Sequence, residues 1–235
     1  MSPAAPDLPA PYRHTTPASE AEAVERQLRL RAAVVLDGSG PAPGATVAGV
    51  DVAYDDGRGL VAAAAVALDA VTLEVTDRAT AVGPVPFPYL PGLLAFRELP
   101  AVLEALGRLR ATPDLVVCDG YGLAHPRRFG LACHLGVVTG LPTLGVAKNP
   151  LTFRHPPLPP HRGAAAPLLD GGEEAGRALR TREGVKPVYV SPGHRMTLGL
   201  ACAHTLALAP RYRLPETTRL ADRLCRQALR TALAR

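Results

Sequence analysis

Two apolar segments of this chain carry an aspartate where a buried strand would bring it beside a neighbouring strand. Asp51 lies within residues 47–52, and Asp119 directly follows Leu115–Cys118. Glu98 opens a stretch with helical character and adds a third acid. Buried carboxylates are costly unless a cation compensates them, and sets of oxygen ligands suit Mg²⁺ or Mn²⁺. Each acid alone also fits a turn or a helix cap, but together they make the chain a candidate metal-dependent nuclease.

Length, composition and charge favour a single cytoplasmic domain that acts as a monomer. A chain of 235 residues with 47% hydrophobic content can bury an ordinary core, and its net charge of +5 favours a polyanionic partner. The four cysteines form no CxxC pair and three of them lie in apolar runs, which indicates a reducing compartment. Residues 1–17 lack the basic and apolar regions of a signal peptide, and no run approaches the roughly 18 apolar residues of a membrane span.

Hydrophobic periodicity and turn signals predict a mixed α/β fold. Ser19 and Glu22 have the spacing of a capping box at the start of a helix. Turn sequences separate three apolar runs at hairpin spacing, which predicts antiparallel strands. In chain order the predicted elements are a helix over 19–33, strands over 46–53, 60–68 and 73–82, a helix over 93–109, a strand over 115–118, a second helix of the same layer, and a strand over 143–146.

Three antiparallel strands followed by a helix, a strand, a helix and a strand is the order of the RNase H-like fold. Asp51 and Asp119 occupy the places on the first and fourth strands where that fold carries acids. We therefore predict a mixed RNase H-like sheet flanked by helices, within a single domain over 19–235 that follows a disordered tail over 1–18. The predicted C-terminal additions are a Gly/Ala-rich loop around 162–176, strands over 177–181 and 187–190, a helix from near Arg195 and a final helix from Pro215.

Several short motifs occur together and in a fixed order. They cover 47–54, 88–92 with 96–98, 119–120 with 125–128, 145–148, 179–182, 186–195 and 213–216. This set resembles the endonuclease V family of deoxyinosine-directed repair nucleases over roughly residues 19–221. One such tetrapeptide would be weak evidence, whereas the whole set in register is strong evidence.

The resemblance implies a catalytic set of Asp51, Glu98, Asp119, His125 and Lys148. It implies that Asp51 and Asp119 bind the metal directly, while Glu98 acts through a metal-bound water or a second ion. The expected cofactor is Mg²⁺, with Mn²⁺ as a substitute, because such a cation activates water and neutralises charge on the phosphate. His125 and Lys148 would flank the scissile phosphate.

The chain departs from the family pattern at two relevant positions. Asn149 and Pro150 follow Lys148 where many relatives have Ser, which puts the local position of Lys148 in question. Asp222 lies where relatives carry His or an acid, so it is a candidate fourth metal ligand. An acid in the opening turns of a helix also favours the helix dipole, and both interpretations of Asp222 stay open.

A proline-rich segment, Pro88-Tyr89-Leu90-Pro91, is predicted to be a stiff protrusion because each proline fixes its φ angle. By resemblance it is the wedge that separates strands at the lesion, so that the flipped base can be recognised in a pocket. Gly92, Leu94 and Gly120 are the candidate pocket residues. The predicted phosphate contacts are Arg127, Arg128, Arg180, Arg182, His194 and Arg195.

The resemblance implies a DNA repair endonuclease that recognises deoxyinosine and hydrolyses the second phosphodiester bond 3′ to it, leaving 3′-hydroxyl and 5′-phosphate ends. Two alternatives remain open. One is an inosine-specific ribonuclease or structure-specific nuclease of the same fold, since an RNase H-like site accepts many polynucleotides. The other is a non-catalytic nucleic-acid-binding module, which the retention of mutually repulsive carboxylates disfavours.

Overall fold

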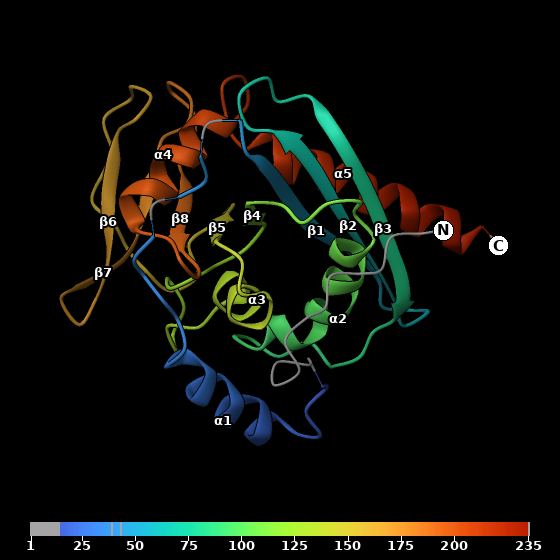
Figure 1. Cartoon of the computed structure of the whole chain (residues 1–235). Coiled ribbons are helices and arrows are strands. Elements are labelled where there is room, and N and C mark those ends of the chain that lie inside the picture. The colour runs from blue at the N-terminus through green and yellow to red at the C-terminus, as the bar shows by residue number, and fades with distance from the viewer. Residues whose placement is uncertain (1–14, 39, 43, 235) are drawn as a thin grey trace.

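The computed structural model describes residues 15–38, 40–42 and 44–234, so most of the tail predicted over 1–18 lies outside the described residues. One eight-stranded sheet has helices on both of its faces (Figure 1). The strands are β1 (Thr46–Asp55), β2 (Leu60–Asp69), β3 (Val75–Pro84), β4 (Leu115–Cys118), β5 (Thr143–Ala147), β6 (Ala165–Asp170), β7 (Glu173–Leu179) and β8 (Val188–Pro192). The helices are α1 (Glu20–Arg31), α2 (Leu94–Gly107), α3 (Leu131–Thr139), α4 (Leu198–Leu208) and α5 (Glu216–Leu233). No described helix is both long and apolar enough to cross a membrane.

Helix α1 begins where the capping-box pattern predicts. The Ser19 hydroxyl accepts a hydrogen bond from the Glu22 N–H at 3.2 Å, and Glu22 in turn accepts from the Ala18 N–H at 2.8 Å. Acids lie in the first turn of the helix and arginines in its last turn, an arrangement that the helix dipole favours. The predicted helix over 19–33 is therefore confirmed, with ends shortened by one or two residues.

The core of the sheet confirms the RNase H-like prediction. Strands β1, β2 and β3 form an antiparallel meander, and β4 and β5 continue the sheet parallel to β1, in the order β3-β2-β1-β4-β5. The alanine-rich β2 is a strand despite the helix propensity of alanine, because both of its faces are covered. Helix α2 packs on one face of β2 and α5 packs on the other, so small side chains suit both contacts.

The C-terminal additions extend the same sheet, and one prediction there was wrong. The segment 162–176 is not a loop, since it contains β6 and the start of β7, joined by Gly171 and Gly172 in the left-handed region. Half of the residues in this hairpin are exposed, so their hydrophobic periodicity is weak. Helix α4 begins three residues later than predicted, because Arg195 has a φ of 50° and Thr197 caps the helix through the Leu200 N–H.

Helix α5 lies unusually close to β1. A Cβ atom on Gly49 would be 2.2 Å from the carbonyl carbon of Thr217, which is in the first turn of α5. The buried face of α5 then packs against β1 and β2 through Ala221 and Cys225. Only a residue without a side chain fits at position 49. The start of α5 therefore packs against β1 at Gly49, two residues before Asp51.

Replacing Gly49 with Ala should lower the free energy of unfolding. Since backbone atoms of β1 or α5 would have to move, we expect a loss of about 1–3 kcal/mol in chemical denaturation. Gly83→Ala, in β3, is the matched control, because a Cβ there would meet nothing within 4 Å. Equal stability of the two variants would contradict the close contact between α5 and β1.

Candidate active site

The sheet brings two of the predicted acids side by side. Asp51 lies in the middle of β1, and Asp119 is the first residue after β4, with its N–H bonded to the Val50 carbonyl at 3.3 Å. Parallel pairing of Val50 with Cys118 sets this register. Glu98 approaches from α2, where it lies in the second turn rather than opening the helix as predicted, because α2 begins at Leu94.

Both Asp51 and Glu98 are held where a negative charge is poorly solvated. Burial, followed by the charge of Asp119, raises the pKa of Asp51 to about 8. Burial also raises the pKa of Glu98 to about 8, although the Tyr54 hydroxyl donates a hydrogen bond to its carboxylate at 3.1 Å. At neutral pH, protons would therefore compete with any cation that these carboxylates bind directly or through water.

Lys148 supplies positive charge to the site. It follows β5, the neighbour of β4, and its ammonium group forms an ion pair with the Asp119 carboxylate. Burial alone would lower the pKa of Lys148, but the bond to Asp119 and the charges of Asp51 and Asp222 raise it. The ammonium group therefore stays protonated and offsets the repulsion between the carboxylates.

The backbone around Lys148 is held by Arg213 and Tyr121, side chains for which the sequence predicted no role. Arg213 donates hydrogen bonds to the carbonyl oxygens of Lys148 and, at 2.8 Å, of Pro187. The Tyr121 hydroxyl donates to the Asn149 carbonyl. Because these bonds use main-chain oxygens, the replacement of Ser by Asn149 does not remove them.

The donor set fits a hard divalent cation. The Oδ1 atom of Asp51 accepts the Val52 N–H at 2.8 Å, whereas its Oδ2 atom is buried and has no hydrogen-bond partner among the described residues. An orphaned carboxylate oxygen beside a second carboxylate is what Mg²⁺ or Mn²⁺ would satisfy. Within the described part of the chain, no three acidic, histidine or cysteine side chains are already gathered as metal ligands, and the role of Glu98 stays a prediction.

Asp222 lies at the edge of this site. Its carboxylate accepts a hydrogen bond from Arg226 at 2.9 Å, one turn further along α5. Its charge nevertheless contributes to the raised pKa of Lys148. Asp222 is thus near enough to act on the site electrostatically, while its role as a fourth ligand stays a prediction.

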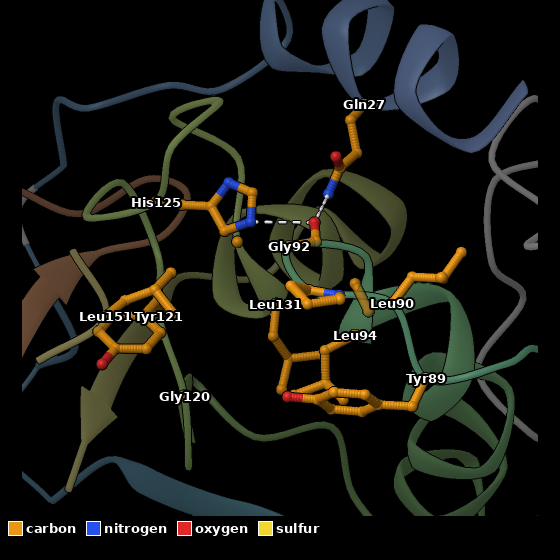
Figure 2. A pocket seen from close by; sticks show the side chains of 13 residues that line it. Gln27, Tyr89, Leu90, Gly92, Leu94, Gly120, Tyr121, His125, Leu131 and Leu151 are labelled. Atoms are coloured by element: carbon orange, nitrogen blue, oxygen red, sulfur yellow. Dashed lines mark hydrogen bonds between the residues drawn. The ribbon is translucent and has the colours of Figure 1, made fainter. Parts of the chain in front are cut away.

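A cavity of about 150 Å³ is lined by Gly120, the residue that follows Asp119 (Figure 2). The predicted pocket residues Gly92, Leu94 and Gly120 all line it, together with Leu131. Tyr89 stands at its rim with 67% of its surface exposed. A cavity of roughly this volume holds one benzene-sized ring, so a partly open pocket of this size suits a single heterocyclic base.

The pocket wall is fixed by three donors that meet at one carbonyl oxygen. Gly92 has a φ of 79°, and its carbonyl accepts from Gln27 at 2.9 Å and from His125 at 3.0 Å (Figure 2), and also from Arg127 at 2.7 Å. Gln27 is only 1% exposed and also accepts from Arg127 through its amide oxygen at 2.6 Å. Sequence reasoning missed Gln27, although its position four residues after the buried Ala23 places it on the inner face of α1.

His125 belongs to the pocket wall and is uncharged at neutral pH. Its Nε2 atom must carry the proton, because it bonds to the Gly92 carbonyl, while Nδ1 accepts the Arg127 N–H at 3.2 Å. Burial and the nearby Arg127 lower the pKa of His125 to about 4. Both ring nitrogens are therefore engaged within the protein, and contact between His125 and a phosphate stays a prediction.

Two of the predicted phosphate contacts have structural partners instead. Arg128 is buried and donates a hydrogen bond to Asp170 at 2.9 Å, which ties it to the end of β6. Arg180 donates to the carbonyl oxygens of Pro159, at 2.7 Å, and of Val185. Both guanidinium groups are therefore hydrogen-bonded within the protein and hold loops in place.

Two further predicted contacts lie at the opposite end of β5 from Lys148. The carbonyl oxygen of His194 accepts a hydrogen bond from the first residue of β5, and its ring accepts the Val35 N–H at 3.2 Å. Arg195 donates to the Gly140 carbonyl at 3.2 Å, also before β5. Since Lys148 follows the opposite end of β5, these residues are separated from the carboxylates by the length of a strand. Arg182 is exposed and fits the prediction better.

Comparisons with known proteins agree with this geometry. The sequence model of the family described as Endonuclease V matches residues 28–223. The chain is 68% identical to an Endonuclease V of Streptomyces coelicolor over 93% of this chain and 94% of the relative. It resembles the crystal structure of an Endonuclease V from Streptomyces avermitilis with a TM-score of 0.89 and 64% identity, covering 96% of this chain and 98% of the other.

A more distant structure has a bound nucleic acid. It is an Endonuclease V of Ciona intestinalis in complex with a 24mer DNA that contains an inosine followed by a ribo-adenosine. The similarity has a TM-score of 0.79 at 26% identity and covers 90% of this chain and 98% of the other. The family model spans every residue of the candidate site named above except Gln27.

Replacing Asp51 with Asn should have opposite effects with and without metal. In EDTA the variant should be more stable by on the order of 1–3 kcal/mol, because a poorly compensated buried charge is removed. Saturating Mg²⁺ should stabilise the original chain by about 2.7 kcal/mol at one hundred times Kd and the variant far less. Chemical denaturation measures both, with the exposed Asp37→Asn as control. Equal stabilisation by Mg²⁺ would remove Asp51 from the ligands.

Proposed function

The chain belongs to the endonuclease V family, and from this premise we propose that it is a metal-dependent DNA repair endonuclease that recognises deoxyinosine. It hydrolyses the second phosphodiester bond 3′ to the lesion and leaves 3′-hydroxyl and 5′-phosphate ends. One observation carries the proposal. Asp119 carries a carboxylate of the site and the next residue, Gly120, lines the pocket, so a base held in the pocket keeps its own backbone beside the acids.

The pocket selects a base by shape and by main-chain hydrogen bonds. Its lining is largely apolar, and Gly92 and Gly120 both have positive φ angles, which bring bare backbone close to a bound ring. Hypoxanthine differs from adenine by offering a carbonyl and a ring N–H, which main-chain groups can distinguish. The Gly92 carbonyl is already saturated by its three donors, so it positions the wall and does not itself read the base.

The wedge is a loop that is anchored at both ends and carries an exposed aromatic ring between them. Phe87 and Leu93 are buried at its two ends, and Leu90 packs against the same cluster. The Phe87 carbonyl is also held by Arg97 at 3.3 Å. Tyr89 between these anchors is exposed, so its ring can take the place of the flipped base in the stack.

Asp51 and Asp119 would hold Mg²⁺ or Mn²⁺, with Glu98 acting through a bound water. When bound, such a cation makes water a stronger acid and neutralises charge on the phosphate. Lys148 keeps a fixed positive charge at the same place, since its pKa is raised. Neutral His125 can orient the pocket but cannot act as a cationic acid at neutral pH.

We also propose that the protein works as a monomer and that it works in the cytoplasm. All four cysteines are free and buried, which fits a reducing compartment.

An inosine-specific ribonuclease is the second candidate function. The ribo-adenosine in the ligand of the Ciona relative favours it, because that protein accepts a ribose directly after the inosine. In both cases the site and the mechanism are the same.

The first test is cleavage of a labelled duplex with one deoxyinosine, beside an unmodified duplex and an inosine RNA strand, with Mg²⁺, Mn²⁺ or EDTA. We expect metal-dependent cleavage one nucleotide beyond the lesion, on DNA in preference to RNA. Asp119→Asn should abolish cleavage with the fold intact by circular dichroism. Cleavage of RNA alone would overturn the substrate, and binding without cleavage of any strand would overturn the enzyme.

Tyr89→Ala should impair recognition more than chemistry. Because the ring is exposed, its loss should leave thermal stability unchanged while it reduces the preference for deoxyinosine over unmodified duplex by roughly tenfold, the loss of one stacking contact. The ratio of kcat/KM on the two duplexes measures this preference. Val71→Ala, at an exposed apolar residue outside the pocket, is the control. Equal losses on both duplexes would argue against a wedge.

A further inference from the structure

The outward face of α5 carries a continuous row of arginines. These are Arg219, Arg223, Arg226 and Arg230, which we call the α5 arginine row. Their spacing of four, three and four residues places them on one side of the helix, over about 17 Å of its length. The opposite side is buried against the sheet through Ala221, Cys225 and Leu229. The row therefore faces solvent along most of the helix.

The row keeps a net positive charge after its own ion pairs are counted. Arg219 pairs with Glu216 at 2.5 Å, and Arg226 pairs with Asp222 at 2.9 Å. Neither Arg223 nor Arg230 has a carboxylate within 4.0 Å among the described residues. At the far end of the helix the Arg58 guanidinium donates to the Leu233 carbonyl at 2.8 Å and adds a further positive charge.

The row begins beside the candidate active site. Thr217, in the first turn of α5, lies directly against Gly49, two residues before Asp51, and Asp222, between Arg219 and Arg223, contributes to the raised pKa of Lys148. Helix α5 covers the face of β1 and β2 opposite to α2 (Figure 1). The row thus leads from the carboxylates along the flank of the molecule that does not carry the wedge.

We propose that the α5 arginine row binds the phosphate backbone of the substrate duplex next to the scissile bond. The inference rests on the proposed function and extends it to the flanking DNA. A duplex carries about five phosphates per strand over about 17 Å of its axis, so a row of this length has several phosphates within its span, and guanidinium groups bind phosphate oxygens bidentately. None of the phosphate contacts predicted from the sequence motifs lies in α5, so the row is an additional surface.

The test is the salt dependence of binding by Arg223→Gln/Arg230→Gln, which removes two charges and breaks no ion pair of the described chain. Binding to a labelled deoxyinosine duplex is followed by fluorescence anisotropy in EDTA from 50 to 200 mM salt. Each lost phosphate contact should reduce the slope of log Kobs against log salt by about 0.9, so the variant should lose roughly tenfold less affinity over this range. With Mg²⁺, KM should rise while kcat at saturating DNA stays unchanged.

The matched control is Arg29→Gln/Arg31→Gln, which removes two exposed arginines from α1. It should keep the slope of the original chain. Equal slopes for the original chain and the α5 variant would overturn the inference and favour an acidic protein partner for the row. An equal reduction of the slope in the α5 and α1 variants would also overturn it, because the effect would then come from net charge and not from the row. Absence of deoxyinosine cleavage by the original chain would instead overturn the proposed function.

Discussion

Repulsion between Asp51 and Asp119 is the constraint around which this molecule is arranged. Parallel pairing of β1 with β4 forces the two carboxylates together, and burial raises the pKa of Asp51 to about 8. Tight packing holds them there, since α5 presses against β1 at Gly49. Lys148 offsets the repulsion only in part, because one oxygen of Asp51 remains without a partner. A cation bound between the two carboxylates would relieve this repulsion and recover the stability that it costs.

The half-buried carbonyl group of Gly92 fixes the position of the pocket relative to the two carboxylates. The Gly92 carbonyl joins α1, the wedge loop and the segment after β4 through Gln27, His125 and Arg127. Every polar atom used in these bonds is satisfied within the cluster, which makes the arrangement rigid and specific. Because Gly120 is covalently joined to Asp119, a rigid pocket also fixes the distance from a bound base to the carboxylates.

Sequence reasoning recovered the elements whose signal is local. The strands β1 to β5 are apolar runs between turn residues, and the α1 cap is a side-chain pattern, so both could be predicted. The hairpin β6–β7 was missed because its strands are half exposed. Arg128 and Arg195 were predicted to contact phosphate because each lies in a motif close in sequence to other candidate site residues. The direction of each side chain, however, depends on hydrogen-bond partners that are distant in sequence. Gln27 was missed for the same reason.

Helix α5 combines two requirements that are physically separable. Its inner face holds Gly49 and the carboxylate of β1 in place, and this face tolerates little change because backbone atoms are in contact. On its outer face Arg223, Arg226 and Arg230 are exposed, while Arg219 lies over the ring of Tyr212. Charged residues repeated on such a face raise the solubility of any helix, but a mixture of signs would serve that purpose equally well. A row of one sign that starts beside the carboxylates of the candidate site favours a polyanion held beside them.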